Sequence, residues 1–383
     1  RRSLPAAAQR ANSGINSSAR PKRIAIGNIR IGNTIPQTTT LEALEAKHQR
    51  AGEVSLANYS FFIGATNDNI DTLLSCDYSL IPGVKLFLGA STGNMLVDNN
   101  TALQRIFSEV PALIAIHSED EDIIRQNKEK AQAQWGDDVP VEQHPLIRST
   151  EACYQSTKKA VELATKYNAR LHILHISTES ELEFLTSAPV EQKRITAEVC
   201  AHHLWWSDED YSRLGTRIKW NPAIKTAQDR EALRQALADG RIDIVATDHA
   251  PHLLSEKEGG ALKAASGGPL VQFSLLMMLE LARKGVFSIE QVIDKMCHAP
   301  ARLFNIEKRG FIREGYFADL AVVKPNEEYP ISDKDVMSRC AWTPLAGETL
   351  HNKVISTYVN GNRVYHNGVI DNSVKGKALK YNH

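Results

Sequence analysis

The sequence has no histidine ahead of His48, and no Asp or Glu occurs among its first forty residues. It has no run of about 18 apolar residues, so it offers no membrane-spanning segment. The five cysteines are scattered and never form a CxxC pair, which argues against a disulfide framework or a thiolate zinc site and favours a reducing compartment. Because 45 basic residues balance 45 acidic ones, the net charge gives no reason to expect nucleic acid or an anionic membrane as a partner.

The start of the chain is basic and differs in composition from the rest of the sequence. Residues 1–40 include seven Lys or Arg, and the first methionine is Met95. One interpretation is a transit peptide, which would be rich in Arg and Ser and poor in acids. The other is a fragment, or a stretch whose true sequence has been lost. The second is favoured, because the first strand of the adjoining domain is also missing.

Short apolar runs alternate with longer, helix-compatible polar segments from about residue 57 onward. The runs are "ANYSFFIG", "GVKLFLGA", "ALIAIHSED", "RLHILHIST", "RITAEVCAHHL" and "DIVATDHAPH", with a weaker candidate in "IRIGNTIP". The segments between them include "EDEDIIRQNKEKAQAQW", "STEACYQSTKKAVELATKYN" and "TAQDREALRQALADG". This alternation indicates βαβ units and a parallel sheet. The predicted fold class is α/β, a (β/α)8 TIM-type barrel whose first strand is missing.

The alternation of apolar runs and helix-compatible segments ends after about residue 285. "SIEQVIDKMCHAPARLF" predicts one or two helices, and "VNGNRVY" is typical of a β-hairpin, although a two-residue turn at Asn362 is an alternative. The chain of 383 residues has room for one domain of roughly 250 residues and a smaller one. We therefore expect an atypical basic segment over 1–30, a barrel over 31–310, and a small β-domain with a tail over 311–383.

Several predicted strands end in side chains that can bind a metal ion. Asp248 follows "DIVAT", His117 follows "ALIAI", His175 follows "LHIL", and Lys85 lies inside "GVKLFLGA". A single histidine at a strand end is more often a hydrogen-bonded structural residue than a ligand. Strand ends of a barrel converge on its catalytic face, however, and imidazole with carboxylate suits zinc in an open site. Together, these residues predict a metal centre.

Lys85 is the informative member of this set. A protonated lysine would repel metal ions, whereas a neutral lysine amine can take up carbon dioxide to give an anionic carbamate that bridges two ions. Burial lowers the pKa of lysine and so favours the neutral amine. Without the other three residues, a lysine extending from a strand end to solvent would be the better interpretation.

Six motifs in order give the sequence a family resemblance. "GVKLFLGASTGNMLVDN", "IAIHSED", "LHILHIST", "WNPAIK", "DIVATDHAPH" and "GFIREGYFADL" resemble the dihydroorotases of the amidohydrolase superfamily, over roughly residues 32 to 370. The resemblance implies two zinc ions bridged by carboxylated Lys85 and a hydroxide. It implies His117 and His175 as ligands of the second zinc and Asp248 as a ligand of the first. His172 is the rival of His175, which is preferred because it directly precedes "IST".

The implied reaction is the reversible opening of the dihydroorotate ring to N-carbamoyl-L-aspartate in pyrimidine biosynthesis. Asp248 would take the proton of the hydroxide and deliver it to the leaving amide nitrogen. The resemblance assigns contacts with the small-molecule substrate to Asn33, Asn221 and His252. The alternatives are another cyclic-ureide hydrolase, of the dihydropyrimidinase or allantoinase type, and a catalytically impaired homologue that binds a partner. The family also suggests a cytoplasmic homodimer.

One part of the family pattern is absent from the sequence. The superfamily binds its first zinc through an H-x-H pair on strand one, followed by an Arg that grips the substrate carboxylate, and no histidine precedes Asn33. Asp248 and one carbamate oxygen would then be the only protein ligands of the first zinc, which is too few for a catalytic site. We therefore expect the chain as given to turn over dihydroorotate poorly. His202 and His203 are expected to be ordinary polar residues at the barrel rim.

Overall fold

The computed structural model describes residues 27–30, 36–88 and 95–382. Eight strands in this part of the chain pair in parallel and alternate with helices. They are β1 (Gly27–Arg30), β2 (Asn58–Phe61), β3 (Ile63–Gly64), β4 (Val84–Phe87), β5 (Ile114–His117), β6 (Leu171–Ile173), β7 (Ile195–Cys200) and β8 (Ile244–Ala246). β1 overlaps the predicted strand "IRIGNTIP" at Ile29 and Arg30, and residues 31–35 of that prediction lie outside the described residues.

The pairing order follows the order of the sequence. β3 to β8 form one sheet in the order β3-β4-β5-β6-β7-β8, and β1 pairs with β2. β2 and β3 belong to one extended segment that is interrupted only at Phe62. In the described ranges the parallel strands therefore occupy seven successive positions, and no pairing joins β8 to β1. This arrangement confirms the predicted α/β class with one barrel strand unaccounted for.

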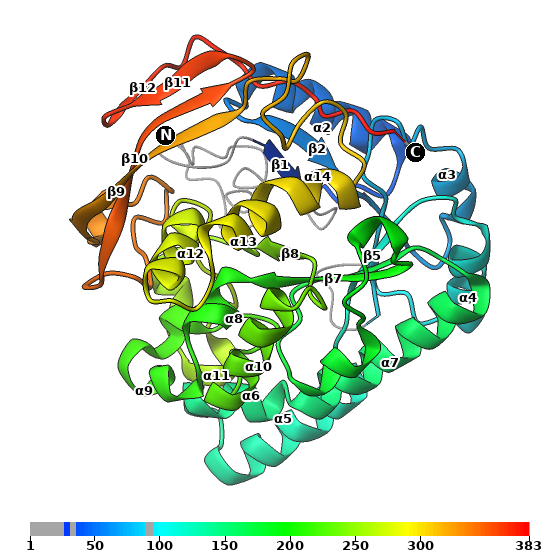
Figure 1. Ribbon diagram of the computed structural model, residues 1–383. Coiled ribbons are helices and arrows are strands. Elements are labelled where there is room, and N and C mark those ends of the chain that lie inside the picture. The colour runs from blue at the N-terminus through cyan, green and yellow to red at the C-terminus, as the bar shows by residue number, and fades with distance from the viewer. Residues whose placement is uncertain (1–26, 31–35, 89–94, 383) are drawn as a thin grey trace, which may run out of the picture.

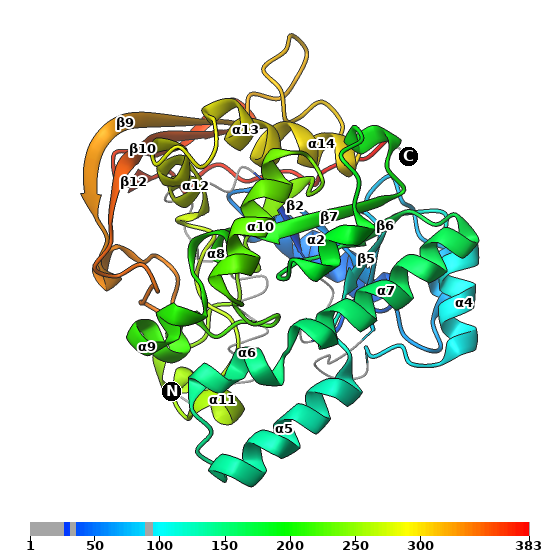
Figure 2. The same ribbon diagram turned by 60° about the horizontal axis from the view of Figure 1, so that its bottom comes forward.

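Helices cover the outside of these strands, as Figures 1 and 2 show for α4, α7 and α10. They are α2 (Leu41–Val54), α3 (Ile70–Leu74), α4 (Asn100–Glu109), α5 (Glu121–Trp135), α6 (His144–Ile147), α7 (Thr150–Tyr167), α8 (Ala201–Trp205), α9 (Tyr211–Leu214), α10 (Ala227–Ala238), α11 (Gly260–Lys263), α12 (Ser274–Arg283), α13 (Ile289–Ile293) and α14 (Ala299–Leu303). None of the described helices combines the length and the apolar character needed to cross a lipid bilayer.

The three helices predicted between strands form where the sequence places them, because each carries its own end signals. The Ser149 side chain accepts a hydrogen bond from the Ala152 amide at the start of α7. α7 ends at Asn168, which adopts the left-handed conformation with φ 52°. At α10, Thr226 and Asp229 form a reciprocal capping box. These caps satisfy backbone groups that would otherwise lack partners.

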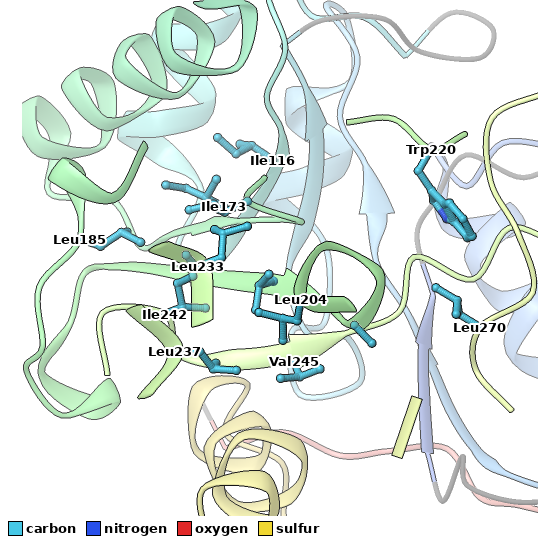
Figure 3. Close-up of a cluster of buried hydrophobic side chains, with 14 of the residues drawn as sticks. Ile116, Ile173, Leu185, Leu204, Trp220, Leu233, Leu237, Ile242, Val245 and Leu270 are labelled. Atoms are coloured by element: carbon cyan, nitrogen blue, oxygen red, sulfur yellow. The ribbon is translucent and has the colours of Figure 1, made fainter. Parts of the chain in front are cut away.

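The main core lies between the strands and their covering helices. Ile116 of β5 and Ile173 of β6 are partners in the parallel ladder and are fully buried. Figure 3 shows Leu233 and Leu237, one helical turn apart on α10, in the same buried cluster. Burial of each such side chain contributes about 1.5–3 kcal/mol relative to exposure. This packing holds the strand ends in fixed relative positions.

A four-stranded antiparallel sheet follows the parallel strands and lies at one side of the molecule, away from α4 and α7 (Figure 1). Its strands, in the order β12-β11-β10-β9, are β9 (Leu320–Pro330), β10 (Thr349–Val359), β11 (Asn362–His366) and β12 (Val369–Ile370). The predicted hairpin is confirmed, with its turn at Asn360 and Gly361, which have φ 52° and 84° as a type I′ turn requires.

The C-terminal tail returns from this sheet to the parallel strands. The Tyr59 amide of β2 donates to the Lys377 carbonyl at 3.0 Å, and the Leu379 amide donates to the Tyr59 carbonyl at 2.9 Å. The tail therefore lies along β2, which attaches the end of the chain to the parallel strands.

Glu280 joins α12 to β10 and generates a stability prediction. Its carboxylate, 1% exposed, accepts from the Arg283 guanidinium at 2.8 Å and from the His351 amide at 3.0 Å. Burial opposes ionisation, but Arg283 and His351 hold the pKa of Glu280 below its ordinary value. Glu280→Gln is expected to lower the free energy of unfolding by about 1.5–3 kcal/mol, the contribution of hydrogen bonds to a charged group.

Urea denaturation at several pH values measures this effect. Because the pKa is lowered in the folded state, the contribution of Glu280 is present at neutral pH and is lost as the pH falls below about 4. The difference between Glu280→Gln and the parent protein is therefore expected to shrink in acid. Glu314→Gln, at an exposed position, is the control and is expected to change stability little at any pH.

Candidate metal centre

The four predicted metal ligands come from four elements of the parallel sheet. Lys85 lies within β4, His117 is the last residue of β5, and His175 and Asp248 follow the ends of β6 and β8. Lys85, His117 and His175 are buried, and Asp248 is partly exposed. Lys85 interacts electrostatically with Asp248, His117 and His175. The structure therefore brings all four residues together, although they are far apart in the sequence.

The two histidines face each other with nitrogens positioned for a shared cation. His117 Nδ1 and His175 Nε2 are 3.0 Å apart, and the rings meet edge to face with centroids 4.9 Å apart. Two zinc–nitrogen bonds of about 2.0–2.1 Å in a tetrahedral site would place their nitrogens about 3.3 Å apart. Burial lowers the pKa of both histidines, which favours the neutral form that binds metal. This pair therefore fits a zinc ion.

The other ring nitrogen of His117 is held by an acid. His117 Nε2 lies 3.2 Å from Glu119 Oε2, and the Arg148 guanidinium donates to the same oxygen. Burial opposes ionisation of Glu119, but Arg148 and His117 hold its pKa well below the usual range. An ionised Glu119 keeps the His117 proton on Nε2, so Nδ1 is directed toward His175 as an acceptor.

Lys85 is in the state that carbamate formation requires. Its side chain is 1% exposed, and its Nζ has no hydrogen-bond partner within the described part of the chain. Burial lowers the pKa of Lys85 well below its ordinary value, while the carboxylates of Glu198 and Asp248 act in the opposite direction. Burial of this kind favours the neutral, nucleophilic amine.

Asp248 combines an unusual backbone with a shifted pKa. Burial, with a contribution from Glu198, raises the pKa of Asp248 to about 7. Asp248 and His175 both have φ 40°, a conformation that non-glycine residues seldom adopt and that concentrates at functional sites. The Trp220 indole nitrogen donates to the Asp248 carbonyl at 3.3 Å. The backbone that follows β8 is thus held in a strained conformation at Asp248, beside the candidate metal centre.

His172, the alternative to His175 as a metal ligand, uses both ring nitrogens in contacts with β7. Its Nδ1 lies 3.0 Å from Thr196 Oγ1 and its Nε2 lies 3.3 Å from Glu198 Oε2. Both ring nitrogens therefore have partners on β7. This geometry favours His175 as the ligand.

The predicted substrate contacts fall in three different places. Asn33 lies outside the described residues. Asn221 directly follows Trp220, and its Oδ1 is buried without a hydrogen-bond partner among the described residues. The carbonyl of His252 accepts from the Trp342 indole nitrogen at 2.7 Å, and its Nδ1 lies 3.6 Å from Glu256 Oε2. Trp220 thus links the Asn221 segment to the exit of β8.

A second group of donor atoms lies beside this centre. Cys200, His202 and His203 are buried, with ligand atoms within 4.8 Å of one another. His202 and His203, which were expected to be ordinary polar residues at the barrel rim, are therefore buried side chains, and His202 stacks on Trp220 with ring centroids 4.5 Å apart. Burial raises the pKa of the Cys200 thiol well above its usual value, which disfavours the thiolate that a zinc site needs. The group around Lys85 is the better metal centre.

Sequence reasoning did not find three residues that shape the site. Glu198 interacts with both Lys85 and Asp248, and Glu119 and Arg148 orient His117. Glu198 had a visible signal, as the one acid inside the otherwise uncharged strand "ITAEVC". Arg148 had none, because it lies in the connection between α6 and α7, and only the tertiary fold brings it to Glu119.

Comparison with known proteins shows the family of this chain. The model of the amidohydrolase family matches residues 117–364. A dihydroorotase of Halobacterium salinarum is 35% identical over 82% of this chain and 72% of its own. The chain belongs to the amidohydrolase family. An allantoinase of Streptomyces avermitilis is 30% identical, over 91% of this chain and 77% of its own. The structure of an L-hydantoinase (dihydropyrimidinase) from Arthrobacter aurescens superposes with a TM-score of 0.86 at 26% identity, covering 92% of this amidohydrolase and 80% of that chain.

The position of Lys85 leads to a metal-binding prediction. Lys85→Ala is expected to lose zinc, because it removes the residue that would bridge the ions, and a short carboxylic acid in the medium is expected to restore part of the zinc content. Elemental analysis of dialysed protein measures both effects. Lys128→Ala, on the polar α5, is the control. If Lys85→Ala binds as much zinc as the parent protein without added acid, Lys85 is not part of the metal centre.

Proposed function

We propose that this amidohydrolase is a zinc-dependent dihydroorotase, which interconverts dihydroorotate and N-carbamoyl-L-aspartate in pyrimidine biosynthesis. The observation that carries the proposal is the pair of facing nitrogens of His117 and His175, 3.0 Å apart, beside the buried amine of Lys85. Relatives named dihydroorotase support the choice of substrate.

The metal-binding roles follow from the donor set. His117 and His175 would hold one zinc ion, Asp248 would contribute to the other, and carboxylated Lys85 would bridge the two. When bound, a zinc pair lowers the pKa of water to near neutrality and polarises the carbonyl under attack. The buried Nζ of Lys85, which has no hydrogen-bond partner in the described part of the chain, is consistent with this occupancy.

The protein's own residues would handle the proton and the substrate. With its pKa raised to about 7, the Asp248 carboxylate can accept a proton from the attacking water and return it to the leaving amide nitrogen at neutral pH. Asn33, Asn221 and His252 would contact dihydroorotate, with His252 directed to its carboxylate. These contacts would distinguish dihydroorotate from neutral cyclic amides, because a lost charge-assisted hydrogen bond costs about 1.5–3 kcal/mol.

A cyclic ureide is the competing substrate class. The allantoinase and the L-hydantoinase similar to this chain carry names of that class, and the L-hydantoinase shares its fold. "TDHAPH" favours dihydroorotate, because His252 offers a cationic or hydrogen-bonding partner for a carboxylate. A cytoplasmic location and a homodimer belong to the same proposal; five cysteines without disulfides are compatible with a reducing compartment.

His252 tests the substrate assignment. His252→Ala is expected to raise KM for dihydroorotate by about tenfold or more, the effect of losing a contact worth about 1.5–3 kcal/mol. Zinc content is expected to stay unchanged, because His252 is assigned to substrate. Steady-state kinetics and elemental analysis decide this, with His298→Ala, at a partly exposed position on another element, as the control. Loss of zinc from His252→Ala would make it a metal ligand instead.

Turnover tests the proposed function as a whole. A version of the chain with a family-type H-x-H-x-R strand in place of the segment before β1 is to be compared with the unmodified chain. The version that carries the H-x-H-x-R strand is expected to open the dihydroorotate ring at about 1 s⁻¹ or faster. Its kcat/KM for dihydrouracil and allantoin is expected to be lower by about tenfold or more. Preference for either ureide would replace the proposed substrate.

A further inference from the structure

Lys257 is a buried lysine that the chemistry above does not use. It ends a short 3-10 helix (Leu254–Lys257) in the loop that follows His252, and its side chain is 1% exposed. Its Nζ donates to the carbonyls of Ala265 at 2.7 Å, Gly267 at 2.8 Å and Lys219 at 3.1 Å. No ion pair joins Lys257 to an acid among the described residues. Backbone carbonyls therefore take the place of water around this nitrogen.

The number of acceptors favours a charged nitrogen. Burial, with Lys219 nearby, lowers the pKa of Lys257 to about 7. Three carbonyl oxygens within hydrogen-bonding distance act against that shift, because only the ammonium supplies three N–H donors. Removing the ammonium would leave three buried carbonyls without this partner, each at a substantial cost.

Two of the three carbonyls belong to a segment that lies directly against His252. At Gly267, with φ 119°, a Cβ would lie 2.6 Å from Ala250 Cβ and 3.4 Å from His252 Cδ2. The Ala250 amide donates to the Gly268 carbonyl at 3.2 Å. The stretch from Ala265 to Gly268 therefore forms the support on which His252 rests.

The third carbonyl connects Lys257 to the exit of β8. The Lys219 carbonyl also accepts from the Gly267 amide at 2.8 Å. The next residue, Trp220, donates to the Asp248 carbonyl and leaves no room for a side chain at Gly268, where a Cβ would lie 2.5 Å from its ring. Lys257 thus ties the Trp220 segment and the His252 support together at one point.

We propose that Lys257 is a positioning residue, whose ammonium crosslinks the Lys219 and Ala265–Gly267 backbones and so places His252 relative to Asp248. It acts through these segments and does not touch the reacting atoms. The expected effect of Lys257 on KM rests on the proposed function, whereas its expected effect on backbone hydrogen exchange does not. The expected signature is a substrate-binding defect without a loss of metal.

Lys257→Met is the test, because it keeps most of the side-chain volume and removes all three donors. Hydrogen exchange at the amides of Ala250 and Gly267 is expected to accelerate by about tenfold or more, since both belong to the crosslinked unit, while exchange in β4 to β6 stays unchanged. In the version that turns over dihydroorotate, KM is expected to rise by about tenfold or more with kcat within about threefold. Zinc content is expected to match that of the parent protein.

Lys263→Met is the matched control, because Lys263, at the end of the nearby α11, is exposed and pairs with Asp138. It is expected to leave exchange and KM unchanged. If Lys257→Met does not fold, Lys257→Gln, which retains two N–H donors, takes its place and is expected to show a smaller effect in the same direction.

Unchanged exchange at Ala250 and Gly267, or an unchanged KM for dihydroorotate, would overturn the inference. A variant that is only less stable, with the parent KM and local exchange, would show that Lys257 has a general structural role. If the parent enzyme turns over another substrate, the proposed function fails, and the exchange measurement still decides the role of Lys257.

Discussion

Parallel pairing of β4 to β8 is the constraint on which the candidate metal centre depends. Parallel strands present their carboxyl ends at the same edge, so residues at those ends meet whatever their separation in the chain. The ladder aligns Phe87 with His117 and Ile116 with Ile173, which places the exits of β4, β5 and β6 side by side. With His117 and His175 at successive exits, the 3.0 Å approach of their nitrogens follows from the register.

The same edge gathers ionisable groups whose burial is unfavourable without partners. An unpaired buried charge is costly, and a protein avoids it by pairing the group or by shifting its pKa. Both solutions occur here. Glu119 is ionised because Arg148 and His117 contact it, whereas Lys85 has no hydrogen-bond partner among the described residues and its pKa falls. A buried amine that has no hydrogen-bond partner among the described residues, beside two imidazoles, is poorly suited to stability alone, and the proposed bridged metal pair rests on this arrangement.

The region around His252, which we propose to contact substrate, is built differently. It consists of loops that a few hydrogen bonds hold in place. Trp342 comes from the region between β9 and β10, and its indole nitrogen reaches the His252 carbonyl. Lys257 binds three carbonyls of two further segments. The part of the chain after the barrel therefore contributes directly to the placement of His252. Loop variation can change specificity while the strand ends keep the metal ligands fixed.

The sequence by itself determined the elements, because their signals are local: the period of the apolar residues, the caps at Ser149 and Thr226, and the Asn360–Gly361 turn. It also predicted Lys85, His117, His175 and Asp248 as candidate metal ligands, since each stands at a strand or strand end, where a polar residue is conspicuous. Only the tertiary structure decided which nitrogens face each other, that His172 contacts Thr196 and Glu198, that Arg148 pairs with Glu119, and that Lys257 donates to three backbone carbonyls. The physical reason is that these contacts join residues tens of positions apart, and their geometry depends on packing that no local pattern encodes.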